Sequence, residues 1–351
     1  MITDTTTDEI YEKLSALLSD TVPDFELRLK AEIAAEINRL KAVKNAVILG
    51  HNYMEPALFH SIPDYVGDSL ELSRRAAETD KDIIVFCGVK FMAETAKILN
   101  PTKKVLIPSL KAGCSLAASI TAADVRELKQ RFPGVPVVTY INTYADVKAE
   151  SDICCTSSNA VDVVNSLKTD RVIFIPDEYL AGNVARETGK KIIYPTRDPL
   201  KRFPDDLDYQ MIGWPGRCEV HEKFSVDDIN NVRKQFPDVV ILAHPECSPE
   251  VVEASDYSGS TTAMIRYVEK TRAPRYLLLT ECSMGDNIAA ANPDKEMLRL
   301  CSVRCPHMNE ITLEDTLESL QKEQYEIEID EEIRAKALRS VERMLEIGRE
   351  D

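Results

Sequence analysis

The sequence is short of basic residues. Its 351 residues include 43 Lys and Arg against 59 Asp and Glu, which gives a formal net charge of −16 at pH 7. Nucleic acid is excluded as an expected partner, because phosphate backbones attract basic surfaces and no Lys- or Arg-rich tract interrupts the acidic background. The sequence also lacks an apolar run of membrane-spanning length, and its first twenty residues lack the basic start and apolar core of a secretory signal. We therefore expect a cytoplasmic protein with no membrane contact.

Several familiar motifs are missing as well. No G-x-G-x-x-G and no G-x-x-x-x-G-K-[ST] follows an expected strand, which argues against a dehydrogenase and against an NTPase. No C-x-x-C knuckle occurs among the nine cysteines, although such knuckles supply the paired ligands of tetrahedral structural zinc sites. Cysteines of a cytoplasmic protein are expected to be reduced, so their arrangement indicates metal or redox chemistry rather than a disulfide framework.

Three of the cysteines occur in one repeated pattern. After six intervening residues each is followed by a Ser or Thr, and three positions later by an Asp. A hydroxyl with an acid three positions on is a helix-start signature. Each cysteine is therefore expected in a loop just ahead of a helix, in three related units that form one three-cysteine site. The copies are Cys114–Thr121–Asp124, Cys218–Ser225–Asp228 and Cys305–Thr312–Asp315.

Three thiolates from separate units suit an iron–sulfur cluster with one iron left open. Soft thiolates select such clusters, and an open iron is a Lewis acid. The alternative is that all three cysteines are buried small hydrophobic residues, as most free cysteines are; the matched spacing favours the cluster. We interpret Cys301, four residues before Cys305, as a thiol that could form a disulfide with it under oxidation. The other cysteines are interpreted mainly as packing residues: Cys87, Cys154, Cys155, Cys247 and Cys282.

Apolar runs repeat three times along the chain. AVILGHNY (46–53), VVTYINTY (137–144) and VVILAHPE (239–246) each end in polar residues, and each precedes a helical pattern. Apolar runs that alternate with amphipathic helices predict parallel sheets built by strand–helix–strand crossovers. We predict an α/β fold with three similar αβα sandwich domains, whose parallel sheets are arranged around a pseudo-threefold axis. Further strands are expected at 83–88, 105–108, 171–176, 191–195 and 275–280.

The domain boundaries are expected from these repeats. The three αβα domains cover 30–135, 136–238 and 239–325. A Pro- and charge-rich stretch at 195–210 is expected to be an inserted loop or lid of the middle domain. Residues 1–29 are expected to form a flexible N-terminal extension, and residues 326–351 a closing C-terminal helix.

Polar residues at the strand ends form a candidate site. Ligands of open α/β sheets bind at the carboxyl ends of the strands. His, Glu and Tyr can transfer protons there, and Asn can orient a substrate. A lone His is more often a hydrogen-bonded core residue, but placement in matched segments favours a functional role for His51, His221 and His244. The other strand-end candidates are Asn52, Tyr53, Tyr140, Asn142 and Glu246.

Hydroxyl residues at three helix starts form a second set. The turns GDS, CTS and GST bring Ser69, Ser157 and the pair Ser260 and Thr261 to places where a helix begins after a loop. Free N–H groups and the helix dipole make such places anion sites. Ordinary N-capping is the alternative for each turn. Three turns that face one point would suit a small polyanion such as a dicarboxylate or a sugar-like phosphate.

Taken together, the motifs resemble those of quinolinate synthase, the iron–sulfur enzyme family of NAD biosynthesis. The resemblance runs from about Val47 to Leu320 and includes, in order, GHNYMEP, YVGDSL, GVKFMAETAKILNP, YIN, CTSSNAV, PGRCEVH, HPEC, YSGST and CPHM. It implies a 4Fe-4S cluster held by Cys114, Cys218 and Cys305. It further implies the condensation of iminoaspartate with dihydroxyacetone phosphate to quinolinate, with release of phosphate and water.

The resemblance also implies roles for single residues. Glu246 is expected near the substrate as acid or base and Tyr53 as an aid to proton movement, with His51 and His221 as further catalytic candidates. The substrate-binding residues that it implies are His51, Ser69, Tyr140, Asn142, Ser157, His244, Glu246, Ser260 and Thr261. A transient contact with L-aspartate oxidase, which would deliver unstable iminoaspartate, is left open. Two other classes also stay open: a non-catalytic iron–sulfur sensor or electron carrier, and a zinc-dependent hydrolase that uses His51 or His244 as an extra ligand.

Overall fold

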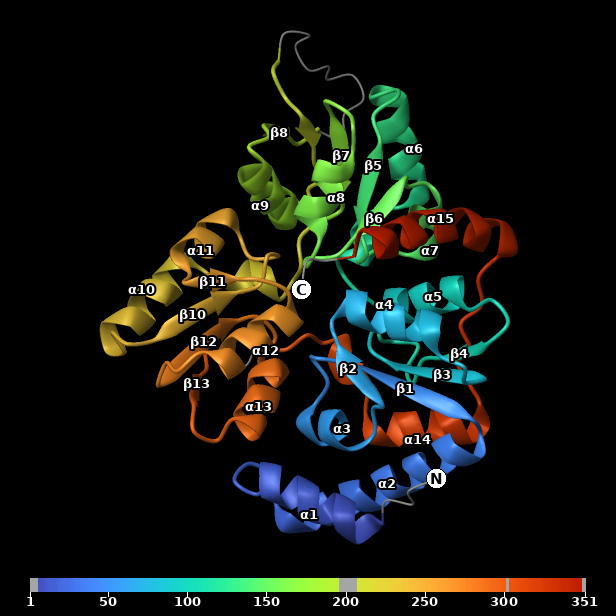
Figure 1. Ribbon diagram of the computed structural model, residues 1–351, viewed down its shortest axis with the longest axis vertical. Coiled ribbons are helices and arrows are strands. Elements are labelled where there is room, and N and C mark those ends of the chain that lie inside the picture. The colour runs from blue at the N-terminus through green and yellow to red at the C-terminus, as the bar shows by residue number, and fades with distance from the viewer. Residues whose placement is uncertain (1–5, 196–206, 301–302, 349–351) are drawn as a thin grey trace.

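The computed structural model describes residues 6–195, 207–300 and 303–348. Its described strands form three all-parallel sheets, with strand orders β2-β1-β3-β4, β6-β5-β7-β9-β8 and β11-β10-β12-β13. Figure 1 shows the three sheets arranged around the centre of the molecule. The predicted α/β class is confirmed. The strands are β1 (Ala46–His51), β2 (Tyr65–Gly67), β3 (Ile83–Cys87), β4 (Lys104–Leu106), β5 (Val137–Tyr140), β6 (Ile153–Cys155), β7 (Val172–Ile175), β8 (Ile192–Ile193), β9 (Met211–Ile212), β10 (Val240–Ala243), β11 (Tyr257–Ser258), β12 (Arg275–Leu279) and β13 (Glu296–Leu298).

Helices cover both faces of each sheet (Figure 1). Because both faces of each central strand are covered, β1 and β3 are buried throughout their length, and their residues are apolar except for His51 at the end of β1. The layering is consistent with the predicted αβα sandwiches. The helices are α2 (Asp24–Val43), α3 (Pro56–Ser61), α4 (Ser69–Glu78), α5 (Lys90–Leu99) and α14 (Leu313–Lys322) at the first sheet; α6 (Ala122–Arg131), α7 (Ala145–Ala149), α8 (Ala160–Ser166) and α9 (Glu178–Thr188) at the second; and α10 (Val226–Gln235), α11 (Pro249–Ala254), α12 (Thr261–Lys270) and α13 (Cys282–Ala291) at the third.

One hydrogen bond recurs in all three units. The carboxylate of an Asp accepts the backbone N–H of a residue in the first strand of its unit, at 2.8 Å each time. Counting residues from the two ends of each bond aligns the three units position by position. The pseudo-threefold axis itself stays a prediction. The bonded pairs are Asp64 with Ile48, Asp152 with Val137, and Asp256 with Ile241. The equivalent sets that follow are His51, Tyr140 and His244; Tyr53, Asn142 and Glu246; and Ser69, Ser157 and Thr261.

The helix after each cysteine packs against the sheet of the next unit. Val125 of α6 lies in one apolar core with Val137 of the second sheet. Ile229 of α10 lies in one core with Ile241 of the third sheet, and α14 contacts α2 and β3 of the first unit. Each cysteine loop is therefore a crossing between two units. The domain boundaries stay predictions, but this packing favours division points close to the cysteine loops.

The expectation of a flexible N-terminal extension is wrong for its described part. Helix α1 (Thr7–Leu18) begins with a capping box between Thr6 and Glu9. Its residues Ile10, Leu14 and Leu18 are buried, and α1 packs on α2. These residues repeat every four positions, so they form one apolar stripe of a helix. The acidic residues Asp8, Glu9, Glu12 and Asp20 are exposed, and their number obscured the stripe.

The remaining expectations for the fold have mixed outcomes. Residues 196–206 of the expected insertion lie outside the described residues, as does Cys301. The closing helix is present as α15 (Glu331–Ile347), and it packs across α7 and β6 of the second unit and α5 of the first. Five strands had no counterpart in the sequence prediction: β2, β6, β9, β11 and β13. Among the helices of the described ranges, none combines the length and the apolar character needed to cross a lipid bilayer.

Candidate active site

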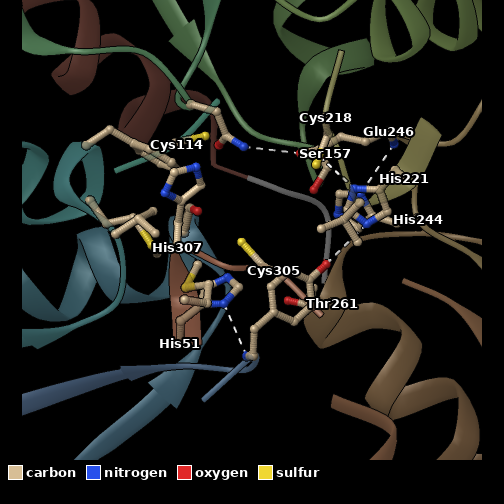
Figure 2. Close-up of a pocket in the computed structure, with 18 of the residues that line it drawn as sticks. His51, Cys114, Ser157, Cys218, His221, His244, Glu246, Thr261, Cys305 and His307 are labelled. Carbon is tan, nitrogen blue, oxygen red and sulfur yellow. Dashed lines mark hydrogen bonds and ion pairs between the residues drawn. The ribbon is translucent and has the colours of Figure 1, made fainter. Parts of the chain in front are cut away.

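One cavity lies at the carboxyl ends of β1, β5 and β10 (Figure 2). It encloses about 720 Å³ of space free of protein atoms, including solvent at its mouth. Every site residue predicted from the sequence lines it except Asn52 and Ser260. The predicted residues that line it are His51, Tyr53, Ser69, Cys114, Tyr140, Asn142, Ser157, Cys218, His221, His244, Glu246, Thr261 and Cys305.

The three repeated cysteines reach this cavity from loops of one shape. Each cysteine carbonyl accepts the N–H four residues on, at 3.0 to 3.1 Å. A short 3₁₀ helix then follows each cysteine, and a capped α-helix follows that. The 3₁₀ helices are η1 (Ala117–Ser119), η2 (His221–Lys223) and η3 (Met308–Glu310). Figure 2 shows Cys114, Cys218 and Cys305 around the cavity. All three cysteines line the same cavity, and their role as the ligands of one metal site stays a prediction.

The electrostatics of the cavity fit a metal group bound by thiolates. Burial raises the pKa of Cys114 to about 12 and that of Cys305 to about 11, and burial followed by the charge of Glu246 raises the pKa of Cys218. Among the described residues no Lys or Arg lines the cavity. Only a cationic centre bound by the sulfurs themselves would therefore favour three thiolates here.

A second potential ligand group overlaps this set. It consists of one potential ligand atom from each of three residues, Cys218, His221 and Glu246, and these atoms lie within 4.8 Å of one another. Thiolate, imidazole and carboxylate all bind zinc. This group uses neither His51 nor His244, the extra ligands expected for a zinc hydrolase. It also leaves Cys114 and Cys305 without a role, so the three-cysteine arrangement explains more of the site.

Glu246 is the centre of a buried polar network. Its Oε1 accepts hydrogen bonds from the Tyr140 hydroxyl at 2.5 Å and from the Asn142 amide at 3.2 Å. Its Oε2 lies 2.8 Å from Nδ1 of His221, without the alignment of a regular hydrogen bond. Burial alone would raise the pKa of Glu246, but His221, His244 and the Tyr140 hydrogen bond together hold it well below its usual value. Glu246 is therefore an ionised carboxylate at neutral pH.

His51 and His244 make the same local turn in two units. Nδ1 of each ring accepts the backbone N–H two residues on, at 3.2 Å for His51 and 3.3 Å for His244. This bond leaves Nε2 as the protonated nitrogen of the neutral ring. Burial lowers the pKa of His51 to about 4 and that of His244 to about 3. Both rings are therefore neutral hydrogen-bond donors rather than cations.

The hydroxyl residues at the helix starts separate into two groups. Ser69, Ser157 and Thr261 are equivalent and line the cavity. Ser260 does not: its hydroxyl donates to Asp68 at 2.9 Å and accepts the N–H of Ala263 at 3.3 Å, which caps α12. For Ser260 the N-capping alternative is correct.

Several residues that line the cavity were missed by the sequence analysis. Ser115, Glu219, His307 and Met308 lie one to three positions after a repeated cysteine, and this closeness was the signal that could have found them. Nε2 of His307 lies 3.2 Å from Oε1 of Glu219, which joins two cysteine loops. Phe91 and Met92 had no signal, because apolar residues of an amphipathic helix are normally core. The further lining residues are Asp68, Val89, Gly113, Thr156 and Val220.

The other described cysteines do not line the cavity. Cys87, Cys154, Cys155 and Cys247 are buried in the core, and Cys282 begins α13. Their interpretation as packing residues is confirmed for the four buried ones.

Comparison with known proteins agrees with this site. Residues 35–346 match the family model described as quinolinate synthetase A protein. The chain is 51% identical over 330 residues to quinolinate synthase of Caulobacter vibrioides (strain NA1000 / CB15N), which covers 93% of this chain and 84% of that relative. It is 50% identical over 338 residues to quinolinate synthase 2 of Mesorhizobium japonicum, covering 96% and 97% of the two chains. It is 53% identical over 311 residues to quinolinate synthase of Agrobacterium fabrum, covering 89% and 84%. The chain therefore belongs to the quinolinate synthase family of enzymes.

Proposed function

We propose that this protein condenses iminoaspartate with dihydroxyacetone phosphate to form quinolinate in NAD biosynthesis. The carbon atoms of quinolinate come from the two substrates, and one phosphate and two waters leave as the ring closes. The observation that carries the proposal is the convergence of the three repeated cysteines and the polar strand ends of all three units on one cavity. Family membership and the names of the relatives support it.

In this proposal Cys114, Cys218 and Cys305 hold three irons of a 4Fe-4S cluster. When bound, such a cluster offers an open iron position that acts as a Lewis acid toward a substrate oxygen or nitrogen. The cavity offers no Lys or Arg from the described chain for the same purpose. A sensor or electron carrier would need no such open position and no set of acid and base groups beside it.

The chain's own residues would supply binding and proton transfer. Ionised Glu246 accepts a proton from substrate carbon or nitrogen. Burial, and then the charge of Glu246, raises the pKa of Tyr53 well above its usual value, so its hydroxyl stays protonated and can donate to a leaving oxygen. Neutral His51 and His244 donate hydrogen bonds from Nε2 and orient substrate oxygens.

Anion binding would fall to the helix starts. Ser69 and Thr261 begin α4 and α12, where uncommitted N–H groups and the helix dipole favour carboxylate or phosphate. Ser157 is the equivalent residue in the second unit. This arrangement suits anionic substrates in a cavity that is bare of Lys and Arg side chains from the described residues.

The test is anaerobic purification followed by an assay. We expect brown protein with about four irons and four sulfides, as a 4Fe-4S cluster requires. Iminoaspartate generated in place from L-aspartate, together with dihydroxyacetone phosphate, should yield quinolinate, detected by chromatography. Colourless, zinc-loaded protein would favour the hydrolase, and an intact cluster without quinolinate formation would favour the sensor or carrier.

Two further proposals belong with this function. Iminoaspartate is unstable in water, so a transient contact with L-aspartate oxidase would shorten its exposure before condensation. The transfer of iminoaspartate from L-aspartate oxidase to this protein is a prediction, and so is the cytoplasmic location expected from the sequence. Co-purification of the two enzymes with and without substrate tests the contact.

A further inference from the structure

The side chain of Asn183 holds the turn that carries Glu246. Its amide nitrogen donates to the backbone carbonyl of Pro245 at 2.9 Å and to that of Cys247 at 3.0 Å, one on each side of Glu246. We call this pair of bonds a carbonyl clamp. Asn183 is buried and belongs to α9 of the second unit, whereas the turn follows β10 of the third. The backbone around one site residue is therefore fixed from a neighbouring unit.

Asn287 makes the same carbonyl clamp at another interface. Its amide nitrogen donates to the carbonyls of Asn52 at 3.2 Å and Met54 at 2.9 Å, which flank Tyr53. Asn287 is buried in α13 of the third unit, and the turn belongs to the first. A carbonyl oxygen only accepts hydrogen bonds, so both asparagines must point their nitrogen at the backbone. Within the described part of the chain their amide oxygens are buried without a hydrogen-bond partner, so only the donor end of each side chain is used.

In the second unit a lysine makes the clamp. Nζ of Lys148 donates to the carbonyl of Ile141 at 2.9 Å and to that of Thr143, which flank Asn142. Lys148 is fully buried and lies in α7 of the same unit, so this clamp does not cross between units. All three site residues that follow the first strand of their unit are thus held at both neighbouring carbonyls by one buried nitrogen.

The repeat explains why the second unit differs. The strand register makes the last residues of β3, β7 and β12 equivalent, and the residues eight positions later are Thr95, Asn183 and Asn287. Their helices pack alike, α5 on α7, α9 on α11 and α13 on α3 (Figure 1). The Thr95 hydroxyl has a single proton, and it donates to the Phe91 carbonyl of its own helix at 2.8 Å. Thr95 therefore cannot hold two carbonyls, and Lys148 supplies the donors instead.

We propose that Asn183, Asn287 and Lys148 are positioning residues of the active site, and that Lys148 stands in for the asparagine that α5 lacks. This inference rests on the proposed function, because it links the rate of that reaction to the placement of the three clamped residues. Without its donor, each turn keeps two buried carbonyls that have lost a partner, and it shifts to satisfy them. Misplacement by about 1 Å can cost on the order of 100-fold in rate.

Asn183→Leu tests the clamp beside Glu246, because leucine has a similar size and no donor. We expect kcat to fall by about 10- to 100-fold with little change in KM and unchanged iron content. Asn100→Leu is the matched control. Asn100 is also buried and donates to two carbonyls, those of Ala76 at 2.8 Å and Ala96 at 3.1 Å, but it lies away from the cavity. This control should lower the Tm and leave kcat unchanged. A normal kcat in Asn183→Leu, or an equal loss of kcat in both variants, would overturn the proposal.

A second test rebuilds in the second unit the pair of residues found in the third. Lys148 and Val252 are equivalent, since each lies four residues before the Asp that bonds the first strand of its unit. Lys148→Val should lower kcat as Asn183→Leu does. Adding Thr95→Asn places an asparagine opposite a valine, as Asn183 and Val252 lie in the third unit, and should restore kcat to within a few-fold of the wild type. A double variant that regains the Tm but not kcat would contradict the stand-in role of Lys148.

A crystal structure gives a readout that does not depend on the reaction. In the Asn183→Leu holoenzyme the Glu246 carboxylate should move from its wild-type place, whereas in Asn100→Leu it should stay. If the wild type makes no quinolinate, the proposed function fails. An unmoved Glu246 in Asn183→Leu contradicts the positioning role separately.

Discussion

Ser260 and Thr261 are neighbours in the chain, yet their hydroxyls serve different purposes. The Ser260 hydroxyl donates to Asp68 at 2.9 Å and caps α12, whereas the Thr261 hydroxyl accepts from Asn52 at 2.9 Å beside the cavity. Helix capping and anion binding were alternatives for this turn. The structure assigns the cap to one residue and leaves the other facing the cavity.

The first prediction separates these two roles. Ser260→Ala should cost about 1 kcal/mol of stability, because the cap is lost, and leave KM unchanged. Thr261→Val should raise KM for dihydroxyacetone phosphate or for iminoaspartate by about 10- to 100-fold, since a hydrogen bond to a charged group contributes roughly 1.5–3 kcal/mol. Thermal melts and saturation curves of the two variants check this. A raised KM in Ser260→Ala alone would reverse the assignment.

The second prediction concerns the cluster ligands. Cys114→Ala, Cys218→Ala and Cys305→Ala should each lose the cluster, because three thiolates are the whole protein ligand set. Cys154→Ala and Cys155→Ala are the matched controls, since both residues are fully buried in the core and away from the cavity. Iron and sulfide quantitation on anaerobically purified variants decides it. Full iron in any of the first three would contradict the ligand set.

The third prediction concerns Glu246. Glu246→Gln keeps the shape of the side chain and removes the carboxylate, so kcat should fall by about 10²- to 10⁴-fold while the iron content stays normal. Glu253→Gln is the control, because the Glu253 side chain is 78% exposed. Near-normal turnover by Glu246→Gln would exclude the acid or base role.

The fourth prediction is a pH dependence of stability caused by His51. Its pKa is about 4 in the folded protein because burial disfavours the charged ring, against 6.5 as the ordinary value. Between these values the unfolded chain binds a proton that the native state does not, so stability should fall as the pH drops from 6.5 toward 4, by about 1.4 kcal/mol per pH unit. His51→Gln should lose about that much less than the wild type between pH 7.5 and 5.5. Parallel acid sensitivity in denaturant melts of both proteins would contradict this.

The fifth prediction concerns Gly216, two residues before Cys218. A Cβ atom there would lie 2.5 Å from the carbonyl oxygen of Pro176, because the cysteine loop pairs backbone to backbone with the end of β7. Gly216→Ala should therefore displace the loop and lower both the Tm and the iron content. Gly285→Ala in α13 is the control, since its new Cβ would meet nothing closer than 3.9 Å and Ala favours helices. Normal iron in Gly216→Ala would show that the loop tolerates the shift.

Features that depend on neighbours in the sequence could be predicted from it. Each cysteine loop ends in a capped helix because a hydroxyl and an Asp three positions apart satisfy each other within one turn, as Thr121 and Asp124 do. Each central strand could be found because both of its faces are covered, so that its apolar run is unbroken. Helix α1 could have been predicted in the same way from the four-residue spacing of Ile10, Leu14 and Leu18. It was missed because the acidic residues of the segment suggested a flexible extension.

What only the tertiary structure decided is which side chains turn toward the cavity. Successive helix residues are rotated by about 100°, so the choice between Ser260 and Thr261 depends on how α12 is turned against its sheet. Phe91 was not singled out for the same reason, since an apolar helix residue has no local sign of what it faces. The sequence by itself determined the three loops, the strand ends and hence the class of site, because those rest on contacts within a few residues. The Asn52 amide and the Thr261 hydroxyl, which meet at 2.9 Å beside the cavity, lie 209 residues apart in the chain, and only the packing of the units brings them together.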